Sequence, residues 1–447
     1  MTDLAAGLTP PPLARHVISE QIKPSRGLLK RVLPSREPMS DDTVFRLMAI
    51  WVVLGTLSQK LSLLLVPGTA LQLVLPFEYL LLAILAAGRR LTFSSARLGL
   101  LLLFFGSATL VNLITSPTMT SLLYVYAIYI PLVARVRVSE DTYMRYLRSF
   151  QILGVFVAGM VFIDWGFQFV HLPMPNMEHF IPAKIKFFNF NYVQALNWGS
   201  KWYKPNAFFF LETSYVAQMV ATVLVIELCT FQRFKYLLIF VLAEVLSFGG
   251  TGFTLVLVSI PIIVIKMRLR LAVAILALTP VAFAAAVQVG LVDNVASRSA
   301  EFDREGSSGN QRFMGQFEAI AESLGKSPSD ALLGKGAGKM LQNGVVVWTP
   351  LTKVTVEYGL IVSAIYLTLL FTSVFGSRVP FVVGYVSVFQ YLFLNGGFLV
   401  PVNVFTIVML TSIFQIKKRD GLAKPPPRAL DLDRKPPDFL LQASRSG

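Results

Sequence analysis

The residues that could do chemistry in this chain are a carboxylate at the entry to an apolar run and a guanidinium in a polar segment between two such runs. Glu212 lies within FFFLETSYVAQM, at the entry to an apolar run, where an acid is costly unless it is paired or hydrated. Such a carboxylate suits a general base that removes a proton from an attacking hydroxyl group. The alternative is a structural role, in which Glu212 charges the first turn of a helix and interacts with the helix dipole.

Arg312 lies at the start of a predicted amphipathic helix at 310–324, whose apolar residues recur at helical spacing. These residues are Phe313, Phe317, Ile320 and Leu324. Backbone N–H groups and the helix dipole at such a start add to the guanidinium in attracting an anion. The pattern predicts a diphosphate site at Arg312, with Arg298 and Arg304 as further cations before a glycine-serine hinge at 306–309.

A glycine-rich segment at 332–339, LLGKGAGK, carries Lys335 and Lys339. Its two lysines predict contact with the same anionic ligand, and the alternative is a flexible turn. The segment lacks the fixed spacing and the terminal Lys-Ser/Thr of a nucleotide P-loop. We therefore expect no nucleotide at this position.

Cations and aromatic rings are mixed in the polar segment at 171–207, where Lys201 and Lys204 lie among tryptophan, tyrosine and phenylalanine residues. Rings offer apolar faces on which sugars stack, and ammonium groups pair with phosphate. Both lysines are therefore candidate substrate-binding residues. The alternative for the aromatic residues is an interfacial belt of the kind found at any membrane surface.

Three further acids, Asp164, Glu227 and Glu244, lie in or near apolar runs, and we expect each to be paired structurally. A glycine-rich turn at 249–252 lets the backbone approach a ligand or a neighbouring helix closely, and tight helix packing is the favoured explanation. Neither feature is assigned to the chemistry.

The composition is that of a membrane protein. Of 447 residues, 54% are hydrophobic and only 15% are charged, whereas soluble proteins have a charged share of about 25%. A single cysteine, Cys229, and three histidines exclude an intramolecular disulfide and a zinc cluster, so we expect no metal and no cofactor. The net charge of +15 comes mostly from short loops beside apolar runs, which favours membrane phosphates or anionic ligands over nucleic acid as partners.

Apolar runs of spanning length predict an all-α fold, a polytopic transmembrane helix bundle of about 12 spans. They lie at 44–65, 69–87, 98–115, 119–135, 148–170, 208–229, 234–249, 252–267, 271–290, 351–375, 379–394 and 398–416. Basic residues, Arg97 among them, mark every second connection, which places both termini in the cytoplasm. The predicted organisation is a tail at 1–43, spans at 44–170, a periplasmic loop at 171–207, spans at 208–290, a larger periplasmic loop at 291–350, spans at 351–416 and a disordered tail at 417–447.

Several short segments, taken in order, resemble the family of bacterial polysaccharide polymerases and O-antigen ligases, multispan enzymes that act on undecaprenyl-diphosphate-linked sugars. The segments are FLETSY at 210–215, LSFGGTG at 246–252, Arg312, ALLGKGAG at 331–338 and VEYGLI at 356–361. Ligases of this family look to carry a histidine shortly before the Glu-x-Gly segment, whereas this chain has Trp348, Thr349 and Pro350 there. The missing imidazole favours a polymerase over a ligase.

The resemblance implies a metal-independent glycosyltransferase of the bacterial inner membrane that joins undecaprenyl-diphosphate-linked oligosaccharide repeat units into exopolysaccharide or O-antigen at the periplasmic face. It implies catalytic roles for Glu212 and Arg312. Its expected partners are the lipid-linked oligosaccharide, membrane lipids, a chain-length regulator and a flippase. The alternatives are an O-antigen ligase, a transporter or flippase of lipid-linked sugar, and a non-catalytic subunit of an export complex.

Overall fold

The computed structural model describes residues 37–66, 69–115, 119–187, 190, 193–196, 200–269, 271–273, 310, 314–338 and 349–417. Its contacts separate Met1–Pro38 from a second unit, Met39–Gly447, which holds nearly all of the described residues. The predicted tails at 1–43 and 417–447 and the predicted span at 271–290 lie almost wholly outside the described residues.

The described part of the chain is mostly helical, as its composition predicts. The α-helices are α1 (Asp41–Leu57), α2 (Val74–Ala87), α3 (Ser95–Thr115), α4 (Met119–Tyr129), α5 (Glu140–Phe169), α6 (Thr213–Ile226), α7 (Phe234–Ser247), α8 (Gly250–Lys266), α12 (Gly315–Lys326), α13 (Pro328–Leu333), α14 (Pro350–Phe375), α15 (Phe381–Phe389) and α16 (Pro401–Ile407). The π-helical segments are η4 (Glu227–Phe231), η5 (Gln390–Leu394) and η6 (Val408–Ser412), and the 3₁₀ segments are η1 (Ile130–Val133), η2 (Met177–His179) and η3 (Ala183–Ile185).

Within the described residues, 4 helical stretches are long and apolar enough to cross a membrane. They are Ser95–Thr115, Glu140–Phe169, Thr213–Phe231 and Pro350–Phe375. Shorter apolar helices are Val74–Ala87, Met119–Val133, Gly250–Lys266, Phe381–Leu394 and Pro401–Ser412. The chain is thus a membrane protein with several candidate transmembrane helices.

Side-chain caps set where the helices begin, and they lie outside the apolar runs. Ser40 Oγ accepts a hydrogen bond from the Thr43 backbone N–H at 3.2 Å, and Ser139 Oγ accepts one from the Thr142 N–H at 3.2 Å. Acidic residues in the first turns of α1 and α5 add a favourable interaction with the helix dipole. Helix α5 therefore starts at Glu140, well before the predicted apolar run at 148–170.

Short strands correct the prediction of a purely helical fold. They are β1 (Ser62–Val66), β2 (Thr69–Gln72), β3 (Leu91–Phe93), β4 (Ala134–Val138) and β5 (Phe414–Ile416). Strands β1 and β2 pair antiparallel, while β4 pairs antiparallel with β3 and parallel with β5. Strand β3 lies between two predicted apolar runs, and the other strands lie at the ends of such runs. A segment of three to five residues is too short for periodicity to distinguish it from a helical turn.

Arg97 was predicted to close a basic loop, but it lies in a helix and is buried. It lies in α3 with none of its surface exposed, and its guanidinium binds carbonyl groups from three other elements. Nη1 donates to the Leu132 carbonyl at 3.1 Å and to the Ser412 carbonyl at 2.6 Å, and Nη2 donates to the Ser373 carbonyl at 2.7 Å. Because helix C-termini leave carbonyl groups unpaired, one guanidinium here satisfies the ends of η1, η6 and α14.

We expect Arg97→Lys to lower the free energy of unfolding by about 1–3 kcal/mol, because a single ammonium cannot reproduce a planar fork aimed at three carbonyl groups. The melting temperature of the detergent-solubilised protein measures this effect. Arg145→Lys is the matched control, since the Arg145 guanidinium is half exposed and pairs with Asp42 at 2.7 Å. An equal melting temperature for Arg97→Lys and the wild type would contradict the structural role.

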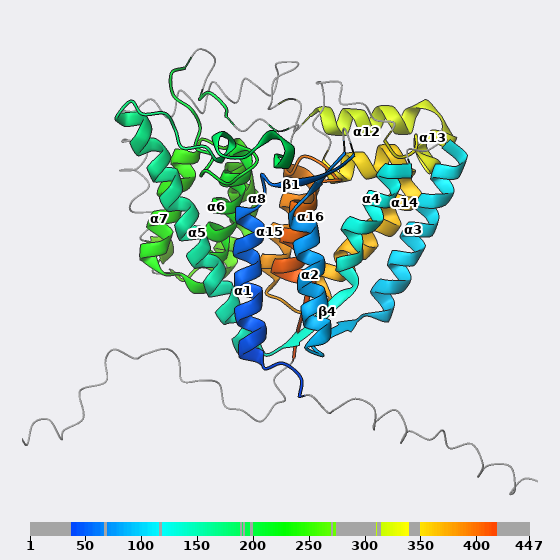
Figure 1. Cartoon of the computed structure of the whole chain (residues 1–447), viewed down its shortest axis with the longest axis horizontal. Coiled ribbons are helices and arrows are strands. Elements are labelled where there is room, and N and C mark those ends of the chain that lie inside the picture. Colours follow the sequence, from blue (N-terminus) through cyan, green and yellow to red (C-terminus); the bar gives the residue numbers. More distant parts are fainter. Residues whose placement is uncertain are drawn as a thin grey trace, which may run out of the picture. The chain divides into compact units, whose positions relative to one another are not determined.

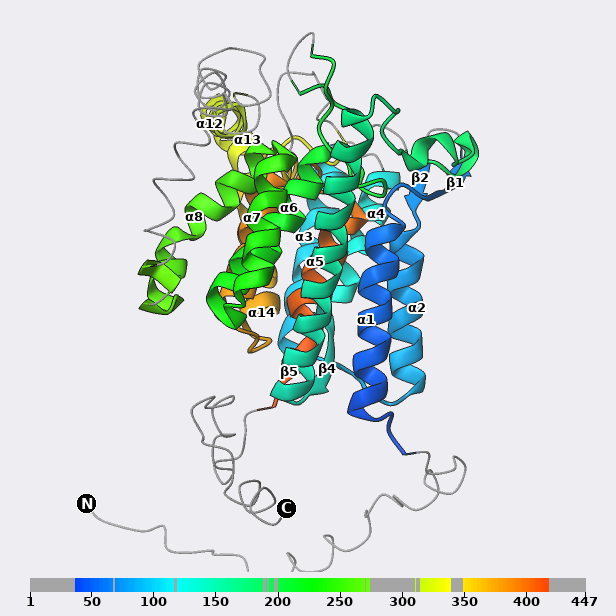
Figure 2. The ribbon, with the colours of Figure 1, turned by 90° about the vertical axis from the view of Figure 1, so that its left-hand side faces the viewer.

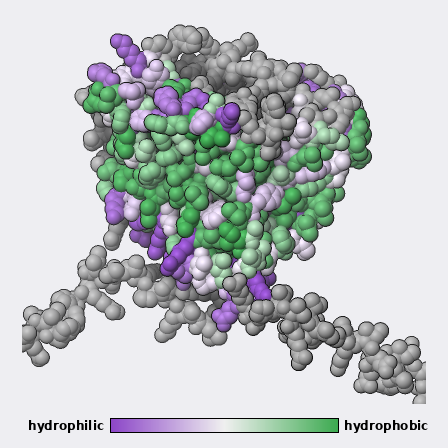
Figure 3. Space-filling view, in the orientation of Figure 1, coloured by the Kyte–Doolittle hydropathy of each residue, from purple (hydrophilic) through white to green (hydrophobic). Residues whose placement is uncertain are grey.

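The two polar segments predicted on the outer side lie at the same end of the second unit. Residues 171–187, helices α12 and α13 and the β1–β2 hairpin are together at the top of Figure 1, and Figure 2 shows the same arrangement after a 90° turn. Strands β4 and β5 lie at the opposite end. Between the two ends, the face drawn in Figure 3 is mainly hydrophobic, with hydrophilic side chains above and below this band.

Candidate functional site

Glu212 lies at the N-terminus of α6. This position is expected both for a general base at the entry to an apolar run and for a structural acid that charges the first turn of a helix. It is the residue before the first helical turn, with extended backbone (φ −145°, ψ 159°), and its side chain is half-buried. The carboxylate does not cap a backbone N–H; Oε2 instead accepts a hydrogen bond from the Ser214 hydroxyl at 3.1 Å. The helix dipole stabilises the anion here, and the partial exposure leaves the carboxylate accessible to a substrate hydroxyl group.

The glycine-rich turn at 249–252 packs against the same helix. A Cβ atom on Gly249 would lie 2.1 Å from the Ala217 Cβ, and one on Gly252 would lie 2.7 Å from the Ala217 carbonyl oxygen. The Thr251 hydroxyl donates to the Ser214 carbonyl at 3.4 Å. The predicted tight helix packing is confirmed, and it brings the 246–252 segment against the first turns of α6.

The segment that leads into Glu212 contains a left-handed turn. Ala207 has φ 48° and Phe208 has φ 64°, a region that bulky residues rarely adopt. Asp164, on α5, accepts hydrogen bonds from the Asn206 and Ala207 N–H groups, at 3.1 and 2.9 Å. The expected pairing of Asp164 is therefore with backbone N–H groups of this turn.

Lys60, which the sequence did not single out, binds the same turn from the other side. It follows α1, is 1% exposed, and donates from Nζ to the Phe208 carbonyl at 2.7 Å and to Asn176 Oδ1 at 2.9 Å. A lysine inside a predicted apolar run, at 44–65, is the signal that could have identified it.

Glu227 and Glu244, the other two acids for which the sequence predicted structural pairing, differ from each other. Glu227 accepts hydrogen bonds from the Arg233 side chain, with Nη2 to Oε2 at 2.7 Å and Nε to Oε1 at 2.9 Å, so its predicted pairing is confirmed. Glu244 is 2% exposed, and neither of its carboxyl oxygens has a hydrogen-bonding partner among the residues that the structure describes. Its Oε1 lies close to Gly252, within the packed contact of α6, α7 and α8.

The glycine-rich segment at 332–339 packs, over its described residues, on a break in α14. Gly359 has φ 75° and ψ 177° inside the helix, which frees the carbonyl groups before it. The N–H groups of Lys335 and Gly336 donate to the Val356 and Glu357 carbonyls at 3.0 and 2.7 Å. These residues therefore form a turn that is hydrogen-bonded to α14.

Close approach of two backbones explains the glycines at this contact. A Cβ atom on Gly334 would lie 2.5 Å from the Gly359 nitrogen, and one on Gly359 would lie 2.2 Å from the Leu332 carbonyl oxygen. The Ala337 N–H donates to Asn112 Oδ1 of α3 at 2.9 Å. The segments at 331–338 and 356–361, which carry part of the family resemblance, are thus in direct contact, with Lys335 half-buried beside the break.

Helix α12 buries two polar side chains against the rest of the protein. Gln316 and Ser323 are each 1% exposed, whereas Phe317 is 50% exposed. Gln316 Oε1 accepts a hydrogen bond from the Thr349 hydroxyl at 2.8 Å, which ties α12 to the first turn of α14. The amphipathic helix is observed, but its apolar stripe is only partly packed, through a contact of the Phe317 and Phe393 rings at 6.5 Å.

The aromatic residues of the first outer segment are divided between packing and exposure. Trp202 packs against Trp165 and Phe169 of α5, with ring centroids 5.9 and 5.4 Å apart. Lys201 is exposed and Lys204 is half-buried. Trp202 therefore packs within the protein, and whether the segment forms an interfacial belt or binds a glycan stays a prediction.

Four of the predicted site residues lie outside the described residues: Arg298, Arg304, Arg312 and Lys339. The structure thus tests neither the diphosphate site nor the hinge at 306–309. Helix α12, which follows Arg312, begins at Gly315.

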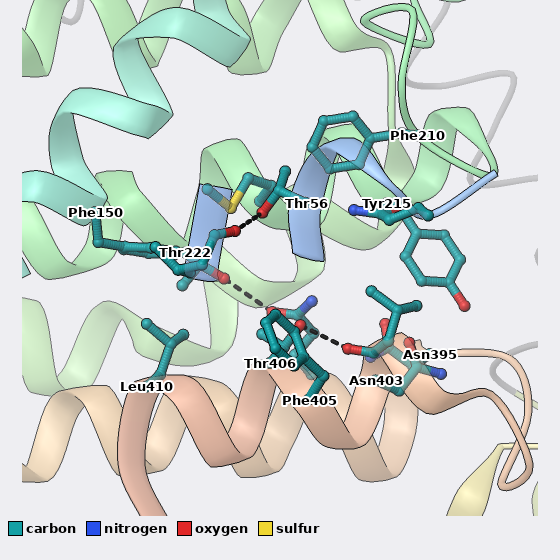
Figure 4. A pocket seen from close by; sticks show the side chains of 15 residues that line it. Thr56, Phe150, Phe210, Tyr215, Thr222, Asn395, Asn403, Phe405, Thr406 and Leu410 are labelled. Carbon is teal, nitrogen blue, oxygen red and sulfur yellow. Dashed lines mark hydrogen bonds between the residues drawn. The ribbon is translucent and has the colours of Figure 1, made fainter. Parts of the chain in front are cut away.

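A cavity of about 40 Å³, lined by both apolar and polar side chains, lies between α1, α6, η5 and α16 (Figure 4). Its lining includes Gln59 and Asn395, whose Oε1 and Oδ1 atoms have no hydrogen-bonding partner among the described residues. The Thr222 hydroxyl donates to Gln390 Oε1 at 2.8 Å on one wall. The volume holds roughly two to three water molecules, and unpaired amide oxygens would bind them.

Amide side chains within the apolar runs are the sequence signal that could have identified this cavity. Gln218 and Gln390 hydrogen-bond each other at 3.2 Å, and Asn403 Nδ2 donates to the Gly396 and Gly397 carbonyls at 3.2 and 3.3 Å. Tyr215 of α6 donates to the Gly396 carbonyl at 3.4 Å. The 395–397 turn therefore lies beside the helix that begins after Glu212.

Among the described residues, no group of three or more His, Cys, Asp and Glu side chains could hold a metal ion. A scan against protein-family models finds no match to this chain, and a search of curated proteins finds no significant similarity.

Proposed function

We propose that this chain is a polymerase that joins undecaprenyl-diphosphate-linked oligosaccharide repeat units at the periplasmic face of the bacterial inner membrane. The observation that carries the proposal is the position of Glu212, a half-buried carboxylate at a helix N-terminus, at the same end as both polar outer segments. The contact between the 331–338 and 356–361 segments adds support, because both belong to the resemblance.

The proposed membrane arrangement has about 12 spans, cytoplasmic tails at 1–43 and 417–447, and periplasmic loops at 171–207 and 291–350. The apolar helices and the shared end of α12 and residues 171–187 support it. On this arrangement, Arg97 and the β3–β4–β5 sheet lie on the cytoplasmic side.

In the proposed reaction, a sugar hydroxyl of one lipid-linked unit attacks the anomeric carbon of another. Glu212 accepts the hydroxyl proton as the new glycosidic bond forms. The bond between the anomeric carbon and the diphosphate oxygen breaks, and undecaprenyl diphosphate leaves with the bonding electrons. Arg312 stabilises the charge that develops on the diphosphate, which is where electrostatic stabilisation lowers the barrier most.

The remaining cations are assigned to substrate binding. Arg298, Arg304 and Lys339 would hold the diphosphate together with Lys335, which the structure places beside the break in α14. Lys201 and Lys204 would contact the glycan or its phosphate from the first periplasmic loop. The reaction as proposed uses no metal and no cofactor.

A flippase of lipid-linked sugar is the second candidate, because four amide side chains line the cavity inside the helix bundle: Gln59, Gln390, Asn395 and Asn403. A strain that lacks this chain separates the possibilities. A polymerase predicts single repeat units exposed on the periplasmic face and no long chains. Units that stay on the cytoplasmic leaflet would indicate a flippase, and long chains that remain on the carrier lipid would indicate a ligase.

A further inference from the structure

The turn at Asn206–Phe208 is the most strained described segment near Glu212. Ala207 and Phe208 are consecutive non-glycine residues with positive φ, at 48° and 64°. Such backbone is unfavourable for a side chain with a Cβ atom and persists only where the surroundings enforce it. The groups that enforce it here are therefore informative about what the turn does.

Two buried ionisable side chains hold the turn from two different elements. Asp164 on α5 has no exposed surface, and its Oδ2 accepts from the N–H groups of Asn206 and Ala207. Lys60, after α1, donates to the Phe208 carbonyl. Two successive N–H groups aimed at one carboxylate form an anion-binding nest, and the ammonium secures the next peptide group.

A short, buried stretch connects this turn to Glu212. The Phe210 N–H donates to the Asn206 carbonyl at 3.3 Å, and Phe210 and Leu211 are 3% and 0% exposed. Such packing leaves little freedom between the turn and the first residue of the site. A change in the turn therefore displaces the Glu212 carboxylate.

We infer that Lys60 and Asp164 are positioning residues that hold the Asn206–Phe208 turn in its strained form and thereby fix the Glu212 carboxylate for its reaction. The inference rests on the proposed function for the role of Glu212. The clamp, by which we mean the hydrogen bonds from Lys60 and Asp164 to the Asn206–Phe208 turn, is a property of the fold and does not depend on the proposed function.

Hydrogen exchange of the purified protein in lipid nanodiscs tests the clamp. In Asp164→Asn, the Asn206 and Ala207 amides should exchange about 10–100-fold faster, because each loses a charge-assisted hydrogen bond. Lys60→Met should accelerate the same segment independently. Gln168→Met is the matched control: Gln168 lies one turn further along α5 and binds Tyr203 of the same loop, with its Oε1 accepting from the Tyr203 N–H at 2.7 Å.

Gln168→Met should therefore accelerate exchange at Tyr203 and leave the Asn206–Phe208 turn unchanged. Unaltered exchange at Asn206 and Ala207 in both Asp164→Asn and Lys60→Met would overturn the clamp. Equal acceleration of the turn in Gln168→Met would also overturn it, since the effect would then be general loosening of the loop.

Elongation kinetics with a lipid-linked repeat unit test the positioning role. Both clamp variants should lower kcat about tenfold or more with an unchanged KM, because the substrate still binds while the base is misplaced. Faster exchange of the turn with an unchanged kcat would overturn the positioning role. A wild-type protein without elongation activity would contradict the proposed function and this role with it, while the exchange result would still decide whether the clamp exists.

Discussion

Replacing Glu212 with glutamine is expected to lower the rate of chain elongation by about 10²–10⁴-fold, the usual contribution of a general base. Glutamine has nearly the same shape as glutamate and keeps an oxygen that can accept a hydrogen bond from the Ser214 hydroxyl. The variant therefore removes the ability to take a proton while preserving the helix start. Glycan length distributions from cells that carry the variant, compared at equal protein levels, measure the effect.

Glu318→Gln is the control for this experiment. Glu318 is an exposed carboxylate on α12, at the same end of the molecule as Glu212. It should leave the length distribution unchanged. Chains of normal length from Glu212→Gln would remove Glu212 from the chemistry and leave it the structural role of charging the first turn of α6.

Replacing Arg312 with alanine is expected to lower elongation about 10³-fold or more, while membrane insertion stays intact. The guanidinium is proposed to bind the departing diphosphate, and cations that stabilise a leaving phosphate contribute on this scale. Arg312→Lys should recover only part of the loss, because an ammonium supplies the charge without the bidentate geometry. A glycan gel of the two variants beside the wild type, with membrane-fraction immunoblots, measures both effects.

The helical part of the fold could be predicted from hydrophobic runs because a membrane span needs about 20 apolar residues and leaves a strong signal. Each predicted run that lies in the described residues contains a helix, and tight helix packing at the 249–252 glycines was expected. The strands could not be predicted, because three to five residues at the end of an apolar run carry no distinct period.

Long-range contacts explain the other differences. Because Arg97 directly precedes a predicted apolar run, the sequence indicates a loop cation. Only the fold shows that three helix ends meet at its guanidinium. Likewise, the 332–338 segment resembles a flexible turn until the break at Gly359 supplies unpaired carbonyl groups for it to bind. Lys60 follows α1 and Asp164 lies on α5, more than 100 residues apart, so no local pattern could reveal that both bind one turn.

The most direct test uses the purified protein in nanodiscs with a single lipid-linked repeat unit as the only substrate. If the protein is a polymerase, we expect a ladder of longer lipid-linked glycans, formed with release of undecaprenyl diphosphate and without added metal. We expect Arg312→Ala to lose that ladder. A wild-type protein that moves the unit across the bilayer without lengthening it, or a ladder that forms at an unchanged rate in Arg312→Ala, would contradict the account.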